Sequence, residues 1–194
     1  MNFYISDTHF GHNNVIRFDN RPFRSISEME SIIVSNWNST VKDTDTVYIL
    51  GDFIWSKDEN TWMDICDELA GKKVLILGNH DKKEFSKQLR SRFENITNLL
   101  EITDSMKHVV MCHYPIPFYR SDYSPDIYML YGHVHNTKEA KYIKDFIATI
   151  KERRTGEKGE PLGQCYHVGC MEPYMNYTPR TLKEIISANE PERC

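Results

Sequence analysis

Five short clusters of Asp, Asn and His carry the residue types in this sequence that could do chemistry. They are Asp7-Thr8-His9, Gly51-Asp52, Gly78-Asn79-His80-Asp81, His113 and Gly132-His133-Val134-His135. Imidazoles, carboxylates and an amide without a thiolate suit Mn, Fe, Zn or Ni rather than Ca or a structural zinc. The seven of these side chains that we take as candidate ligands, all but His80 and Asp81, are too many for one ion, so we expect two ions that share one carboxylate. Two ions about 3.5–4 Å apart can activate water and clamp the oxygens of an in-line displacement.

The segments before these clusters predict how they are positioned. Each cluster follows an apolar run that we interpret as a strand, at residues 3–5, 47–50, 74–77, 109–112 and 127–131. Because ligands bind at the carboxyl edge of the strands in α/β sheets, the clusters should meet at one edge. Asp7 and His9 are two residues apart, as are His133 and His135, so in an extended segment each pair would point the same way.

Apolar residues at helical spacing predict helices between the strands. They recur over 29–41, 62–69, 85–89 and 143–150, and Pro179 should begin a closing helix. Ser27 and Glu30 have the spacing of a capping box for the first of these helices. Strands that alternate with helices indicate an α/β fold in one domain over residues 1–194.

Composition excludes several classes of protein. With 194 residues, 40% of them hydrophobic, the chain can bury a full core. A net charge of −4 provides no strong nucleic-acid surface, and no apolar run is long enough for a membrane span. The amino terminus lacks the features of a signal peptide, and five cysteines without a Cys-x-x-Cys fit a reducing compartment. We therefore expect a cytoplasmic protein; the sequence does not indicate its oligomeric state.

The five clusters, in this order, resemble the signature of the calcineurin-like metallophosphoesterases, which is D-x-H, G-D, G-N-H-[DE], a lone H and G-H-x-H. The match spans Asp7 to His135. The resemblance implies a sandwich of two mixed β-sheets flanked by α-helices. It also implies the role of each ligand: Asp7, His9 and His135 would hold one ion, Asn79, His113 and His133 the other, and Asp52 would bridge them. His80 would face the phosphate as the catalytic residue.

Other residues have two interpretations each. Asp81 could be catalytic, but Asp81-Lys82-Lys83-Glu84 has the pattern of a helix cap, which we favour. His167 is as consistent with a structural role as with a place near the site. His12, Asn13 and Arg17 could contact substrate from a loop, and residues 114–126 could form a rim over the metals, with Arg120 as a phosphate contact.

These observations predict a metal-dependent hydrolase of phosphate esters. Protein Ser/Thr phosphatases carry an Arg in the second block, and Gly51-Asp52-Phe53-Ile54-Trp55-Ser56 has none. We therefore expect a small, nucleotide-like phosphodiester as substrate and Mn²⁺ as the first metal to test, with Fe, Zn or Ni as alternatives. A phosphomonoesterase is the second hypothesis. An inactive binding module is a third, and the intact ligand positions and His80 disfavour it.

Overall fold

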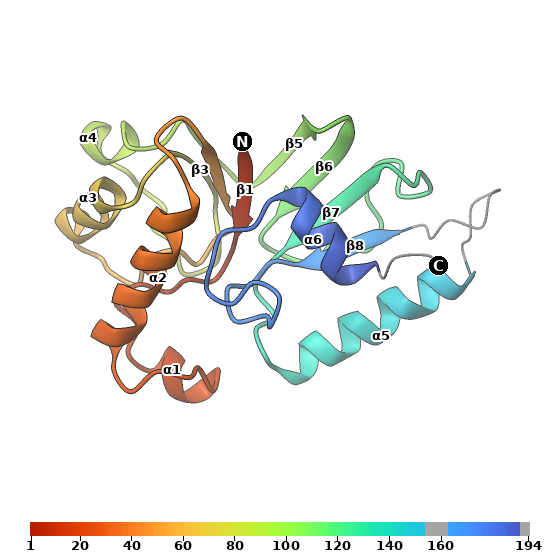
Figure 1. Cartoon of the computed structure of the whole chain (residues 1–194), viewed down its shortest axis with the longest axis horizontal. Coiled ribbons are helices and arrows are strands. Elements are labelled where there is room, and N and C mark those ends of the chain that lie inside the picture. The colour runs from red at the N-terminus through yellow and green to blue at the C-terminus, as the bar shows by residue number, and fades with distance from the viewer. Residues whose placement is uncertain (154–162, 191–194) are drawn as a thin grey trace.

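The strands of the computed structural model form two sheets of four, and the chain completes the first sheet before it begins the second (Figure 1). The model describes residues 1–153 and 163–190. The first sheet has the order β1-β2-β3-β4, with β1 Asn2–Ile5, β2 Thr46–Ile49, β3 Lys72–Ile76 and β4 Asn95–Thr97. The second has the order β5-β6-β7-β8, with β5 Leu99–Asp104, β6 Lys107–Cys112, β7 Ile127–Tyr131 and β8 Gln164–His167. The predicted α/β fold with two sheets flanked by helices is confirmed.

The two sheets differ in strand direction. All three pairs of the first sheet are parallel, whereas the second combines the antiparallel pair β5–β6 with two parallel pairs. The sequence did not indicate β4 and β5. Both are edge strands with partly exposed side chains, so they lack the continuous apolar run that marks a buried strand.

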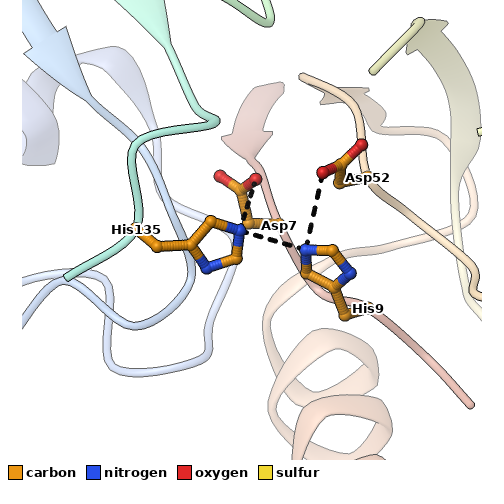
Figure 2. Close-up of side chains that lie close together, drawn as sticks. All are labelled: Asp7, His9, Asp52 and His135. Carbon is orange, nitrogen blue, oxygen red and sulfur yellow. Dashed lines mark hydrogen bonds and ion pairs between the residues drawn. The ribbon is translucent and has the colours of Figure 1, made fainter. Parts of the chain in front are cut away.

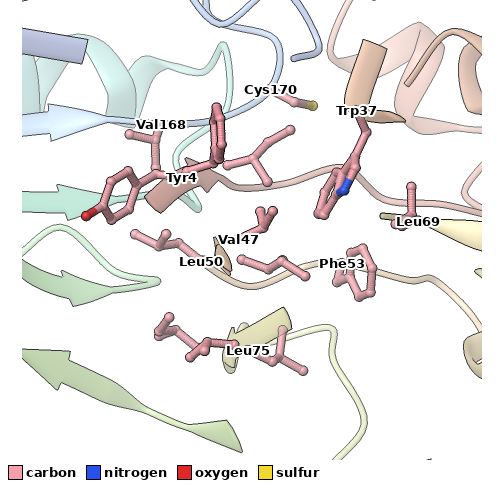
Figure 3. Close-up of a cluster of buried hydrophobic side chains, with 14 of the residues drawn as sticks. Tyr4, Trp37, Val47, Leu50, Phe53, Leu69, Leu75, Val168 and Cys170 are labelled. Atoms are coloured by element: carbon pink, nitrogen blue, oxygen red, sulfur yellow. The ribbon is translucent and has the colours of Figure 1, made fainter. Parts of the chain in front are cut away.

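The sheets are joined where β1 and β8 end. The Ser6 amide donates to the Val168 carbonyl at 2.9 Å, and the Cys170 amide donates to the Ser6 carbonyl at 2.8 Å. Buried side chains fill the space around this junction, including Tyr4 of β1 and Val168 after β8 (Figure 3). The segment that follows β1 therefore runs along the seam between the two sheets, and Asp7 begins there.

Helices cover the outer faces of the sheets (Figure 1). Helices α2 Ile26–Thr40, α3 Glu59–Glu68 and α4 Lys87–Arg90 lie on the side of the first sheet. Helix α5 Lys138–Arg153 lies along the second sheet, and α6 Leu182–Asn189 packs against β1. A short helix, α1 Val15–Phe18, occupies the segment that the sequence indicated only as a loop. No helix in the described part of the chain combines the length and apolarity that a membrane span requires.

The start of α2 corrects the capping prediction by two residues. Ser25, not Ser27, is the cap: its side chain accepts a hydrogen bond from the Glu28 amide at 3.1 Å. Ser25 and Ser27 are each followed by a Glu three residues later, so the spacing alone could not distinguish them. Glu30 instead accepts from the Gly11 amide at 2.6 Å, which ties the loop after His9 to α2. Helix α6 likewise begins after Pro179, with Thr181 as its cap.

Candidate metal centre

Four of the predicted ligands converge at the seam between the sheets (Figure 2). Asp7, His9, Asp52 and His135 are buried, and one ligand atom from each lies within 4.8 Å of the others. The Nε2 atoms of His9 and His135 are 3.1 Å apart. His9 Nε2 lies 3.6 Å from Asp52 Oδ2, and His135 Nε2 lies 3.5 Å from Asp7 Oδ1. Lone pairs brought this close fit a cation among them. The four residues are those that the resemblance implied as the ligands of one ion together with the bridging carboxylate.

The other three predicted ligands lie on the far side of Asp52. His113 Nε2 is 3.0 Å from Asn79 Oδ1 and 3.6 Å from Asp52 Oδ1, and the His133 ring is centred 5.1 Å from the His113 ring. Asp52 thus directs Oδ2 toward His9 and Oδ1 toward His113. This arrangement is compatible with a bridging carboxylate.

The ligand pairs are brought together by turns rather than by strand alternation. Asp7, His9, Asp52, His133 and His135 all have φ between 45° and 74°. The expectation of extended pairs that share one face is therefore wrong, because the strands end before these residues. The loops lie side by side since the Asp7 amide donates to Gly51 O and the His9 amide to Asp52 O, both at 3.0 Å. Left-handed backbone at non-glycine residues costs about 1–3 kcal/mol each and concentrates at functional sites.

Two motif glycines allow the segments to approach this closely. A Cβ on Gly51, whose φ is +84°, would lie 2.5 Å from His113 Nδ1. A Cβ on Gly132 would lie 1.9 Å from Ser6 Oγ. Any larger residue at either position would push a ligand-bearing loop away from the centre.

Hydrogen bonds on the outer side of the imidazoles fix their orientation. His135 Nδ1 lies 3.2 Å from Asp19 Oδ2, and His113 Nδ1 lies 2.8 Å from Leu50 O. Each ring therefore presents Nε2 to the centre, as metal-bound histidines do when a carboxylate or carbonyl holds the other nitrogen. Arg21 holds Asp19 at 2.9 Å and donates to the Asp7 carbonyl at 2.8 Å. The sequence gave no signal for Asp19 or Arg21, because both act through contacts distant in the chain.

Asp81 joins the two loops that carry the central ligands. Its carboxylate accepts from the amides of Asp52 at 3.0 Å, Phe53 at 2.9 Å and Gly78 at 2.8 Å. The capping prediction for Asp81 is wrong, since Ser86 caps α4. Burial raises the pKa of Asp81 to about 6, against the lowering effect of the amides of Gly78 and Phe53.

The protonation states of Asp7 and His9 suit a cation, whereas the raised pKa values of Asp52 and His135 oppose one. Burial would raise the pKa of Asp7, but nearby imidazoles, His135 foremost, lower it to about 2. Burial lowers the pKa of His9 to about 2, although Asp7 opposes the shift. Burial would also lower the pKa of His135, but its hydrogen bond to Asp19 and the charge of Asp7 raise it overall. Near neutral pH, Asp7 is ionised and His9 is neutral, which are the forms that bind metals.

Comparison with known proteins decides the family. The model of the calcineurin-like phosphoesterase family matches residues 3–158. The chain belongs to this family. The family and the buried cluster together fit a metal-dependent phosphoesterase.

Individual relatives match shorter stretches. The chain is 47% identical to the uncharacterized protein MJ1445 of Methanocaldococcus jannaschii over 81 residues, a stretch that covers 41% of this chain and 46% of that protein. It is 34% identical to the gene 66 protein of Mycobacterium phage L5 over 80 residues, a stretch that covers 40% of this chain and 38% of that protein. Each match thus spans less than half of the relative. A crystal structure of AQ665 from Aquifex aeolicus, a protein of unknown function, covers 97% of this chain and 98% of its own, with a TM-score of 0.68 and 28% identity.

His80 lies at the mouth of the metal centre. Its amide donates to Asp52 Oδ1 at 2.9 Å, while its side chain is exposed. Its ring is centred 4.7 Å from that of Trp55 and 5.9 Å from that of His9. His12 stacks on Trp55 at 3.9 Å with an interplanar angle of 7°. His12 and Trp55 thus border the site; the sequence had suggested His12 and gave no sign of Trp55.

The remaining substrate candidates lie farther out. Asn13 is exposed before α1, and Arg17 is exposed within it. Arg120 Nη1 lies 3.8 Å from Glu101 Oε2, beside β5. Their predicted contacts with substrate stay predictions. Segment 114–126 does begin at the centre, because the Tyr114 ring is 4.7 Å from the His133 ring.

His167 has features of both of its interpretations. Its Nδ1 lies 2.7 Å from Glu172 Oε1, which anchors the ring. Its Nε2 is buried 3.9 Å from Asp7 Oδ2. The ring therefore packs between Glu172 and the carboxylate of a predicted ligand.

Proposed function

We propose that this phosphoesterase hydrolyses a small phosphodiester with two divalent metal ions, Mn²⁺ being the first to test. The observation that carries the proposal is Asp52, whose two oxygens face two separate groups of ligands. A single-ion site has no use for a second group. Asp7, His9 and His135 would hold one ion, and Asn79, His113 and His133 the other.

The ions would activate water and neutralise charge on the phosphoryl oxygens. The protein itself orients the ligands through Asp19, Leu50 O and Asp81. His80, exposed at the mouth and fixed through its amide on Asp52, would give a proton to the leaving oxygen. Trp55 packs against the His80 ring and limits its movement.

Two open cavities flank the centre, and they support a diester. One, of about 510 Å³, begins at His133, and the other, of about 400 Å³, begins at Asn79 and His80. A diester has two substituents and could place one in each cavity.

The positions of two arginines also favour a diester over a monoester. A dianionic monoester gains from an Arg fork on its outer oxygens. Arg21 is instead bonded to Asp19 and to the carbonyls of Asp7 and Thr8, and Arg120 faces Glu101. Neither contributes such a fork in this structure.

The test compares a diester and a monoester that share the same leaving group, 4-nitrophenolate. With Mn²⁺ bound, kcat/KM for bis(4-nitrophenyl) phosphate should exceed that for 4-nitrophenyl phosphate. The Asp52→Ala protein, purified in the same way, serves as the control for contaminating activity and should be inactive. A clear preference for the monoester would overturn the diester assignment and establish the phosphomonoesterase instead. Parallel assays with Zn²⁺, Ni²⁺ and Fe²⁺ would rank the metals.

A further inference from the structure

The cavity that begins at His133 is a groove between the start of segment 114–126 and helix α5. Its walls include Pro115, His133, Val134, Ile143 and Phe146. His133 is one of the predicted ligands, so the groove shares a side chain with the candidate metal centre. Its volume of about 510 Å³ falls within the range of small-molecule sites, about 300–1,000 Å³.

Part of the face of α5 that lines the groove is not used by the core. The helix buries Ala140 and Ile147 against side chains of the second sheet, and Ile143 of the groove wall packs against the same cluster. Tyr142 and Phe146 are 67% and 43% exposed, although both are aromatic. They are four residues apart and therefore stand next to each other on one face of the helix.

A third exposed aromatic extends this surface. Phe118, 63% exposed, meets the Phe146 ring edge-on with centroids 5.9 Å apart. Three exposed aromatic rings beside a catalytic centre form an apolar patch of the kind that marks a binding site.

The chemistry of the lining selects the ligand. Among the described residues that line the groove there is no Lys or Arg, and the one carboxylate is that of Glu139. A second phosphate or a carboxylate would find no cation there. An uncharged ring would bury apolar area against Ile143 and meet Phe146 in an edge or stacked contact. The other cavity, by contrast, contains Lys57 and His80.

We propose that this groove binds an uncharged aromatic or heteroaromatic ring carried by the substituent that stays on phosphorus. The assignment rests on the proposed function, in which His80 protonates the leaving oxygen. Because His80 lines the opposite cavity, the leaving group lies there and the retained substituent lies on the His133 side. The substrate class is thus an aryl or nucleoside-like phosphodiester.

Phosphonates test the groove without any turnover, because their P–C bond is not hydrolysed. Calorimetry on the Mn-loaded protein should show phenylphosphonate binding about tenfold more tightly than methylphosphonate, as expected when a ring is buried. In a Tyr142→Ser/Phe146→Ser protein the two ligands should bind within about twofold of each other, with methylphosphonate unchanged. Both side chains are exposed, so the fold does not depend on them.

The matched control is Met106→Ser. Met106 is 95% exposed in the turn between β5 and β6, at the opposite end of β6 from His113, and its loss should leave the tenfold preference intact. Equal binding of the two phosphonates to the unmodified protein, or an undiminished preference after the double substitution, would overturn the proposal. So would a dimer that the double substitution dissociates, because the groove would then belong to a second copy.

Turnover separates this inference from the proposed function. Phenyl and ethyl esters of 4-nitrophenyl phosphate share one leaving group, so their kcat/KM ratio should fall about tenfold in the double variant. A retained phenylphosphonate preference in a protein that hydrolyses no diester would support the groove and refute the diesterase. Failure of both phosphonates to bind would refute both.

Discussion

Replacing Asp81 with Ala should destabilise the protein and loosen the metal centre together. Its carboxylate accepts three backbone amides, from Asp52, Phe53 and Gly78. These amides belong to the loop with the proposed bridge and to the loop with Asn79 and His80. No other residue joins the two loops with three hydrogen bonds to one side chain in the described part of the chain.

The expected magnitude follows from the amides left without a partner. The amides of Asp52 and Phe53 make buried hydrogen bonds to Asp81, and that of Gly78 makes a partly buried one. A buried donor without a partner costs about 1–3 kcal/mol, so the two buried amides predict a loss of about 2–6 kcal/mol in unfolding free energy. Loss of a residue that orients the ligands should also weaken metal binding about 10–100-fold.

Urea denaturation of the metal-free protein measures the first effect, and competition with a chelator measures the second. Asp58→Ala is the matched control. Asp58 is exposed and accepts one amide, from Asn60, as the cap of α3, so its loss should cost about 1 kcal/mol and leave metal affinity unchanged. An Asp81→Ala protein no less stable than Asp58→Ala, with normal metal affinity, would refute the reasoning.

Three further predictions concern the centre itself. Asp52→Ala should lower the bound metal below two ions per chain by elemental analysis; two retained ions would refute the bridging role. His80→Ala should keep both ions yet lose about 10²–10⁴-fold in kcat on a diester with a poor leaving group, as expected for a general acid, and a near-normal rate would refute that role. Because Asp19 and Asp7 raise the pKa of His135, protons should displace the metal as pH falls through that pKa, and Asp19→Asn should move this loss of affinity to lower pH. Unchanged pH profiles of chelator competition would show that Asp19 does not set the ring's basicity.

The sequence indicated the residues that converge at the candidate metal centre because each lies in a short motif directly after an apolar run. His113, for example, follows β6 immediately, and Asp52 follows the strand residues of β2 after a short connection. The same local logic predicted the strands that lead to the site. It missed β4 and β5, because edge strands need no continuous apolar run.

What the sequence could not predict depends on contacts between distant segments. Asp19 meets His135 across 116 positions, and Asp81 meets Phe53 across 28. No spacing rule connects such residues, so Asp19 was missed and Asp81 was assigned to a cap. The predicted cap of α2 was wrong for another reason. Ser25 and Ser27 are each followed by a Glu three residues later, and only the folded chain selects one of them.

The left-handed backbone at five of the ligands also restricts how this site could be lost in evolution. Glycine, asparagine and aspartate adopt positive φ readily, whereas β-branched residues do not. A descendant that abandons catalysis but keeps the fold should therefore carry Asn or Gly at positions such as 7, 9 and 135, and should rarely carry Val, Ile or Thr there. Inactive members of the fold would then be recognisable by their Gly and Asn at these positions.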